Sequence, residues 1–114
     1  GAPLIFEPGL EEMLRTNIAA GRMRFTTNTA EATAGSQAVF LAVGTPPRAD
    51  GSADLANIES AAVATARALS GYTVIVVKST VPVGTCDRLE KLIRDARRVP
   101  VETDSLYNPV ERAA

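Results

Sequence analysis

The segment from Tyr72 to Thr85 (YTVIVVKSTVPVGT) constrains the fold more than any other part of the chain. Its residues 74–77 form a continuous β-branched run that is too short for a helix and follows the turn signal Ser70-Gly71. Such a run is typical of a parallel strand that is buried on both faces. The chain then turns at residues 81–85 into a charge-rich segment with helical spacing. We therefore expect a strand that leads directly into a helix, which is where open α/β sheets bind their ligands.

A second segment of the same kind comes earlier in the chain. Residues 38–43 are apolar and are followed by Gly44-Thr45-Pro46-Pro47, much as the later strand is followed by Ser79-Thr80. Because two neighbouring parallel strands end at the same edge of a sheet, we expect Thr45 and Thr80 to lie at one shared rim. A threonine hydroxyl there can bond a ribose, an amide or a water without a charge to desolvate. The same hydroxyl can equally cap its own turn or the next helix.

The remaining segments alternate between helical and strand patterns. Helical spacing predicts a first helix that starts with Pro8 at its first position and faces the core with Leu10, Met13, Leu14 and Ile18. Alternation of polar and apolar residues predicts a strand at 22–27 with one face in water, and a short helix is expected at 29–35.

Further along, Asp54 is expected to cap a long helix that ends at Ser70-Gly71. A last helix of about a dozen residues should follow residue 84, with a weak edge strand at 99–103. This order predicts an α/β fold, a partial Rossmann-like (doubly wound), mainly parallel sheet with flanking helices. The length of 114 residues fits a single domain over 1–114.

Composition excludes several classes of function. A net charge of −1 gives no electrostatic reason to bind nucleic acid or an anionic membrane. No apolar run has the length of a membrane span, and the first residues lack a signal-peptide pattern. The single Cys86 excludes an intramolecular disulfide and fits a reducing cytoplasm. With no histidine and one cysteine, no metal site is expected.

Several ordered motifs resemble one known family. The blocks AVGTP at 42–46, DGSADL at 50–55 and KSTVPVGT at 78–85 are similar to the N-terminal NAD-binding domain of the UDP-glucose/GDP-mannose 6-dehydrogenase family. Segments within 3–14 and 21–27 fit the same family in the same order, so the resemblance covers roughly residues 3–100. It implies a Rossmann-like fold, NAD as the cofactor of the parent enzyme, and oxidation of a nucleotide-sugar 6-hydroxyl to a carboxylate.

The resemblance also implies roles for individual residues. It places Thr45 in contact with the cofactor and Thr80 near the nicotinamide, where it helps to position a catalytic water. The expected cofactor-binding residues are Gly44, Thr45, Pro46, Ser79 and Thr80, and the expected catalytic residue is Thr80. Lys78 could reach a phosphate or could simply be a solvated charge. Cys86 is not expected to be catalytic, because the family's nucleophile lies in a GGxCFPKD motif that these residues do not contain.

The departures from the family pattern are as informative as the matches. No GxGxxG precedes the matching blocks, and in the divergent tail at 104–114 Val110 stands where the family motif has a glutamate. We therefore expect a truncated domain that is inactive alone, binds NAD weakly or not at all, and meets a nucleotide-sugar substrate only within a complete enzyme. The alternative is a non-catalytic remnant that acts as an oligomerising or interaction module.

The same pattern predicts an open sheet edge. In the doubly wound order, two strands would separate 22–27 from 38–43, and these 114 residues do not contain them. An apolar edge at 38–43 is rarely tolerated in water. We expect that either the strand at 22–27 pairs with it or a second copy covers it, which predicts a homodimer.

Overall fold

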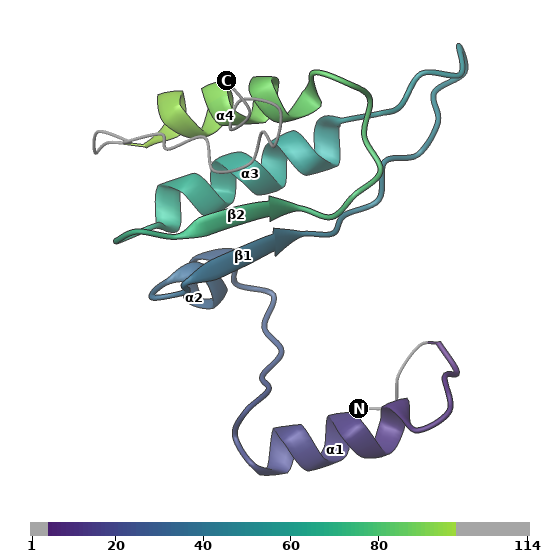
Figure 1. Ribbon diagram of the computed structural model, residues 1–114, viewed down its shortest axis with the longest axis vertical. Coiled ribbons are helices and arrows are strands. Elements are labelled where there is room, and N and C mark those ends of the chain that lie inside the picture. Colours follow the sequence, from purple (N-terminus) through teal and green to yellow (C-terminus); the bar gives the residue numbers. More distant parts are fainter. Residues whose placement is uncertain (1–4, 98–114) are drawn as a thin grey trace, which may run out of the picture.

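The computed structural model describes residues 5–97 of the chain (Figure 1). Along the chain, its elements are α1 (Leu10–Ala19), α2 (Thr29–Thr33), β1 (Ala38–Leu41), α3 (Ala56–Ala68), β2 (Val74–Val77) and α4 (Thr85–Ala96). The predicted strand at 99–103 and the divergent tail at 104–114 lie outside the described residues. No helix in the described part is long and apolar enough to cross a membrane.

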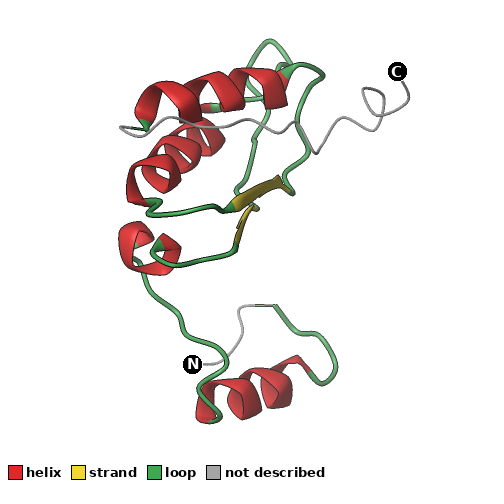
Figure 2. Ribbon diagram, turned by 60° about the vertical axis from the view of Figure 1, so that its left-hand side comes forward, coloured by secondary structure: helices red, strands yellow, loops and turns green. Residues whose placement is uncertain are grey.

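The two strands form a parallel pair in which Ala38 lies opposite Val74 and Leu41 opposite Val77. The connection between them runs through α3, so β1, α3 and β2 make one βαβ unit, and α4 follows β2 directly. Both α3 and α4 lie on the same side of the sheet (Figures 1 and 2). The predicted α/β class and parallel pairing are therefore confirmed.

The core lies between the strands and these two helices. It consists of the buried residues Leu41, Ile58, Ala62 and Leu89, around which half-buried residues pack: Val39, Val43, Leu55, Ala61, Ile75, Val77, Val81, Leu92 and Ile93. Because side chains alternate across a strand, the odd-numbered residues of both strands face the helices. The even-numbered side chains face away from this core, and 63% of Phe40 is exposed. All four residues of β2 are half-buried, so the expectation that this strand is buried on both faces is wrong: helices cover only one face of the sheet.

The predicted strand at 22–27 is wrong. These residues form no strand, and the amide groups of Arg22 and Met23 instead donate to the carbonyl of Asn17, at distances of 2.9 and 3.2 Å. A strand is stable only when its backbone groups find a partner strand, and none lies beside this segment in the described part of the chain. Residues 22–27 thus have the polar–apolar alternation of a strand but no strand with which their backbone could pair in the described part of the chain.

Helix α1 forms where the spacing predicts it, but it does not face the core. None of its residues is buried, and 60% of Met13 and 42% of Ile18 are exposed. Figure 1 shows α1 apart from the sheet, joined to α2 by an extended segment. The helix begins at Leu10 after Gly9, whose φ of 81° is left-handed, so Pro8 is not its first residue as expected.

The other boundaries differ from expectation by one or two residues. Strand β1 ends at Leu41 and not at Val43, and α2 ends at Thr33. Helix α3 starts at Ala56 with Leu55 at the N-cap, so Asp54 is not the cap as expected. The Asp54 carboxylate instead accepts the amide of Ala56 at 3.0 Å and holds the turn just before the helix. The last helix has 12 residues, as expected.

Candidate functional site

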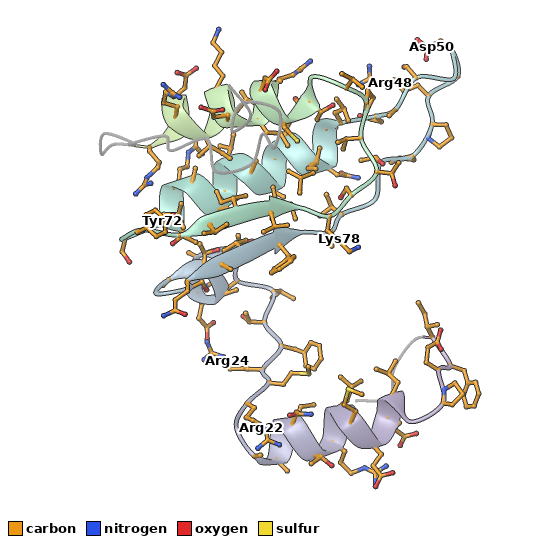
Figure 3. All side chains as sticks on the ribbon, viewed as in Figure 1. Arg22, Arg24, Arg48, Asp50, Tyr72 and Lys78 are labelled. Atoms are coloured by element: carbon orange, nitrogen blue, oxygen red, sulfur yellow. The ribbon has the colours of Figure 1, made fainter. Side chains whose placement is uncertain are left out.

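The carboxyl ends of β1 and β2 lie side by side because the strands are parallel and in register. Residues 42–46 follow β1 and residues 78–81 follow β2, and together they are called the rim below. Lys78, labelled in Figure 3, is the first residue after β2 and therefore the first residue of the second segment of the rim. Its side chain is exposed, as expected for either of the two roles left open for it.

Thr45 and Thr80 are brought together, as the sequence predicts. The Thr45 hydroxyl donates to the backbone carbonyl of Thr80 at 2.9 Å. This bond uses the only proton of the Thr45 hydroxyl, so towards a ligand that oxygen can act only as an acceptor. The Thr80 hydroxyl makes no hydrogen bond within residues 5–97 and is on an exposed residue, so it remains able to donate.

Ser79 binds the protein itself. Its half-buried hydroxyl is 2.7 Å from the carbonyl oxygen of Val43 and 3.3 Å from that of Leu41. The Leu41 carbonyl already accepts the amides of Lys78 and Ser79, at 2.9 and 3.2 Å. Both of its lone pairs are therefore engaged, which leaves the shorter contact to Val43 as the hydroxyl's main bond. The hydroxyl proton of Ser79 is thus engaged within the protein.

Asn57 belongs to the same network and was missed by sequence reasoning. Its side-chain amide, from the first turn of α3, donates to the carbonyl of Gly44 at 3.4 Å. A polar residue in the first turn of a helix carries no sequence signal for a contact with a loop 13 residues earlier. Gly44, like the other described glycines, has open space where a side chain would begin, since no atom beyond its two chain neighbours lies within 4 Å of that position.

The loop after the rim is held by its own bonds. Pro47 and Ala53 form an antiparallel bridge, and Arg48 pairs with Asp54 at 3.2 Å. Figure 3 shows Arg48 and Asp50 on this loop, which extends beyond the helices. The Pro46 carbonyl accepts the Asp54 amide at 2.8 Å, so Pro46 helps to close the loop.

Two carboxylates in this loop have lowered pKa values. The hydroxyl and then the amide of Ser52 hold the pKa of Asp50 below its ordinary value of 3.8. The pKa of Asp54 is also lowered, mainly by the hydrogen bond from the amide of Ala56 and next by that from the side chain of Arg48. Hydrogen bonds to the charged form are the cause in both cases, so both groups are carboxylates at neutral pH.

Cys86 lies on the exposed surface, as the second residue of α4. Within the described residues, no cluster of three or more histidine, cysteine or acidic side chains is placed to hold a metal ion. The chemistry available at the rim is therefore that of hydroxyls, backbone amides and one lysine.

Comparison with known proteins gives a consistent result. A model of the UDP-glucose/GDP-mannose dehydrogenase family, NAD binding domain, matches residues 1–114. A UDP-glucose 6-dehydrogenase of Rhizobium meliloti (strain 1021) is 52% identical over 92 residues, which are 80% of this chain and 21% of that protein. One from Bacillus subtilis (strain 168) is 45% identical over 109 residues, 96% of this chain and 25% of that protein.

Two solved structures share the fold. A UDP-glucose dehydrogenase of Pyrobaculum islandicum superposes with a TM-score of 0.77 at 45% identity, over 86% of this chain and 24% of the other. A GDP-mannose dehydrogenase of Pseudomonas aeruginosa, solved as a ternary complex, superposes with a TM-score of 0.79 at 35% identity. The match covers 85% of this chain and 23% of the other. The chain thus spans about a fifth to a quarter of the length of the relatives that it matches.

Proposed function

Because the chain belongs to the UDP-glucose/GDP-mannose dehydrogenase family, as part of its NAD-binding domain, we propose that its rim contacts NAD in a nucleotide-sugar 6-dehydrogenase. The observation that carries this proposal is the hydrogen bond between Thr45 and Thr80, which joins the two strand ends where α/β sheets bind ligands. The parent reaction is the two-step oxidation of a nucleotide-sugar 6-hydroxyl to a carboxylate, in which two NAD molecules each accept one hydride and a water supplies the second carboxylate oxygen.

The residues of the rim fit a cofactor of this kind. Gly44 leaves open space on its side-chain face, which lets a ligand approach the backbone closely. The free hydroxyl of Thr80 can donate to a carboxamide or ribose oxygen, or hold a water in place. Thr45 offers only an acceptor. Pro46 and Ser79 contribute by holding the loop and the strand ends and need not touch the ligand.

We propose further that these 114 residues alone bind NAD weakly and oxidise no nucleotide sugar. They contain no GxGxxG turn to hold the pyrophosphate by backbone amides. Association costs an estimated 4–15 kcal/mol, whereas each hydrogen bond at the rim contributes roughly 0.5–1.5 kcal/mol. The exposed Cys86 lacks the sequence surroundings of the family's nucleophile.

The test is an NMR titration of the chain with NAD, with the amide shifts followed residue by residue. Weak binding should shift the amides of Gly44, Thr45 and Thr80 at millimolar NAD and leave that of Gly71, outside the rim, unchanged. Thr80→Val should reduce the shifts. Shifts that avoid the rim would rule out the proposed site. An absorbance assay with UDP-glucose should detect no NADH, and any NADH would contradict the proposed inactivity.

A second candidate, self-association as a homodimer, is favoured by the exposed apolar surface. The outer edge of β1 has no partner strand within residues 5–97, Phe40 is largely exposed, and α1 buries none of its residues. A second copy that pairs with this edge would cover it. Light scattering should detect a dimer at high micromolar concentration, and Phe40→Lys should make it monomeric. A monomeric parent chain would refute this candidate without affecting the NAD proposal.

The organisation of the chain and its compartment belong to the same proposal. We take residues 1–114 as one partial dinucleotide-binding domain, since the family match runs through all of them. A cytoplasmic location agrees with a nucleotide cofactor and with a single, exposed cysteine.

A further inference from the structure

Two side-chain donors in the rim and one in the neighbouring helix α3 each bind a backbone carbonyl of a different peptide unit in the rim. Ser79 donates to the carbonyl of Val43, Asn57 to that of Gly44, and Thr45 to that of Thr80. The distances are 2.7, 3.4 and 2.9 Å. All three bonds cross between segments that are far apart in the sequence, so they form only once the sheet and α3 are in place.

The carbonyl of a peptide unit and the amide that follows it lie in one rigid plane. No cis peptide occurs in the described residues, so in each unit the N–H points opposite to the C=O. A donor that fixes the carbonyl of Val43 therefore also fixes the direction of the Gly44 amide. By the same geometry, Asn57 fixes the Thr45 amide and Thr45 fixes the amide of Val81.

The three amides whose directions are fixed have no acceptor of their own. Within residues 5–97, the N–H groups of Gly44, Thr45 and Val81 make no hydrogen bond. Unpaired backbone donors are normally satisfied by water, a side chain or a ligand. Here they lie in the two segments that follow the ends of β1 and β2.

We infer that Ser79, Asn57 and Thr45 are positioning residues, which act by fixing the directions in which the amides of Gly44, Thr45 and Val81 face a ligand at the rim. Ser79 reaches Val43 from the β2 side and Thr45 reaches Thr80 from the β1 side, so the amides of Gly44 and Val81 point away from each other and serve different ligand oxygens. The ligand class is a hydrogen-bond acceptor, such as a ribose hydroxyl, a carboxamide oxygen or a phosphate oxygen. The relevance to NAD rests on the proposed function, whereas the orienting effect is a property of the ligand-free chain. An experiment can therefore refute the orienting effect without refuting NAD binding, and the other way round.

The unliganded chain should show an unusual combination in NMR. Amides that are held in place but unbonded are expected to be ordered on the nanosecond timescale, with order parameters near ~0.85, and yet to exchange rapidly with solvent. Order parameters below about 0.6 for Gly44 and Val81 in the parent chain would overturn the inference, since nothing would then be fixing their planes.

Single substitutions should loosen one amide each. Ser79→Ala should lower the order parameter of the Gly44 amide below about 0.6 and leave that of Val81 unchanged. Thr45→Val should lower the order parameter of the Val81 amide and leave that of Gly44 unchanged. Ser79→Thr keeps the hydroxyl and should preserve the order of Gly44. Ser70→Ala, which removes the same hydroxyl from an exposed serine at the end of α3, is the matched control and should change neither amide.

The pattern separates positioning from general destabilisation. A purely structural loss would loosen Gly44 and Val81 together in both variants, and that outcome would overturn the inference. Unchanged order at Gly44 in Ser79→Ala would overturn it as well. If circular dichroism shows that Ser79→Ala does not fold, the Thr45→Val variant and the parent chain still decide the question.

Discussion

The side-chain hydroxyl of Thr45 donates a hydrogen bond to the backbone carbonyl of Thr80 across 2.9 Å, although 35 residues separate them. A comparable bond closes the opposite end of the sheet, where the Thr73 hydroxyl donates to the carbonyl of Ser36 at 2.8 Å. Each end of the parallel pair is thus fixed by a threonine that reaches across to the other strand's flanking loop. The two bonds differ in burial and in place, since only the first lies at the rim.

Replacing Thr45 with valine keeps the shape of the side chain and removes the donor. Because this bond is exposed, the variant should lose roughly 0.5–1.5 kcal/mol of unfolding free energy, measured by urea denaturation. Thr73→Val is the matched control and should cost at least as much, because its bond is half-buried. It should leave any NAD-dependent shifts at the rim intact. If Thr73→Val abolished those shifts, the rim would not be a local site.

The two isoleucines Ile58 and Ile18 should respond very differently to truncation. Ile58 is fully buried between the sheet and α4, so Ile58→Ala should cost about 2–5 kcal/mol. Ile18 is on α1, which buries none of its residues, so Ile18→Ala should change the unfolding free energy by no more than about 0.5 kcal/mol. Urea denaturation at a concentration where the chain is monomeric measures both. A loss of unfolding free energy well above about 0.5 kcal/mol in Ile18→Ala would show that the Ile18 side chain is packed, and would contradict the exposed position of α1.

Acidification should release the turn before α3. The folded pKa of Asp54 lies below its ordinary value of 3.8, so its carboxylate stabilises the fold above that pH, and this contribution is lost as the pH falls through the folded pKa. The amide of Ala56, which donates to this carboxylate, should report the change in an NMR titration with a midpoint below 3.8.

The control for this titration is Asp54→Asn. The asparagine side chain keeps an oxygen that can accept the Ala56 amide but does not titrate, so the acid transition at Ala56 should disappear. A midpoint at or above 3.8 in the parent chain would contradict the stabilising role of the charge.

Cys86 should be dispensable. The side chain of Cys86 is exposed, so Cys86→Ser should change the unfolding free energy by no more than about 0.5 kcal/mol. The rim shifts caused by NAD should be unaffected. Loss of those shifts in a variant that remains folded, as judged by circular dichroism, would show that the thiol takes part in binding.

The sequence by itself determined the types and places of the elements that form the core. The β-branched run at 74–77 and the apolar spacing of α4 specify a strand and a half-buried helix, because periodicity follows directly from backbone geometry. The ends of the two strands were predicted to meet for the same reason, and Thr45 and Thr80 do meet.

Only the tertiary structure decided which groups find partners. Residues 22–27 have the pattern of a strand but no neighbour to pair with, and the apolar side of α1 has nothing to pack on within the described residues. Likewise, no local pattern reveals that the hydroxyl of Ser79 binds Val43 or that Asn57 reaches Gly44. A hydrogen bond depends on the position of both groups, and for segments distant in the sequence those positions are set only when the whole sheet and its helices assemble.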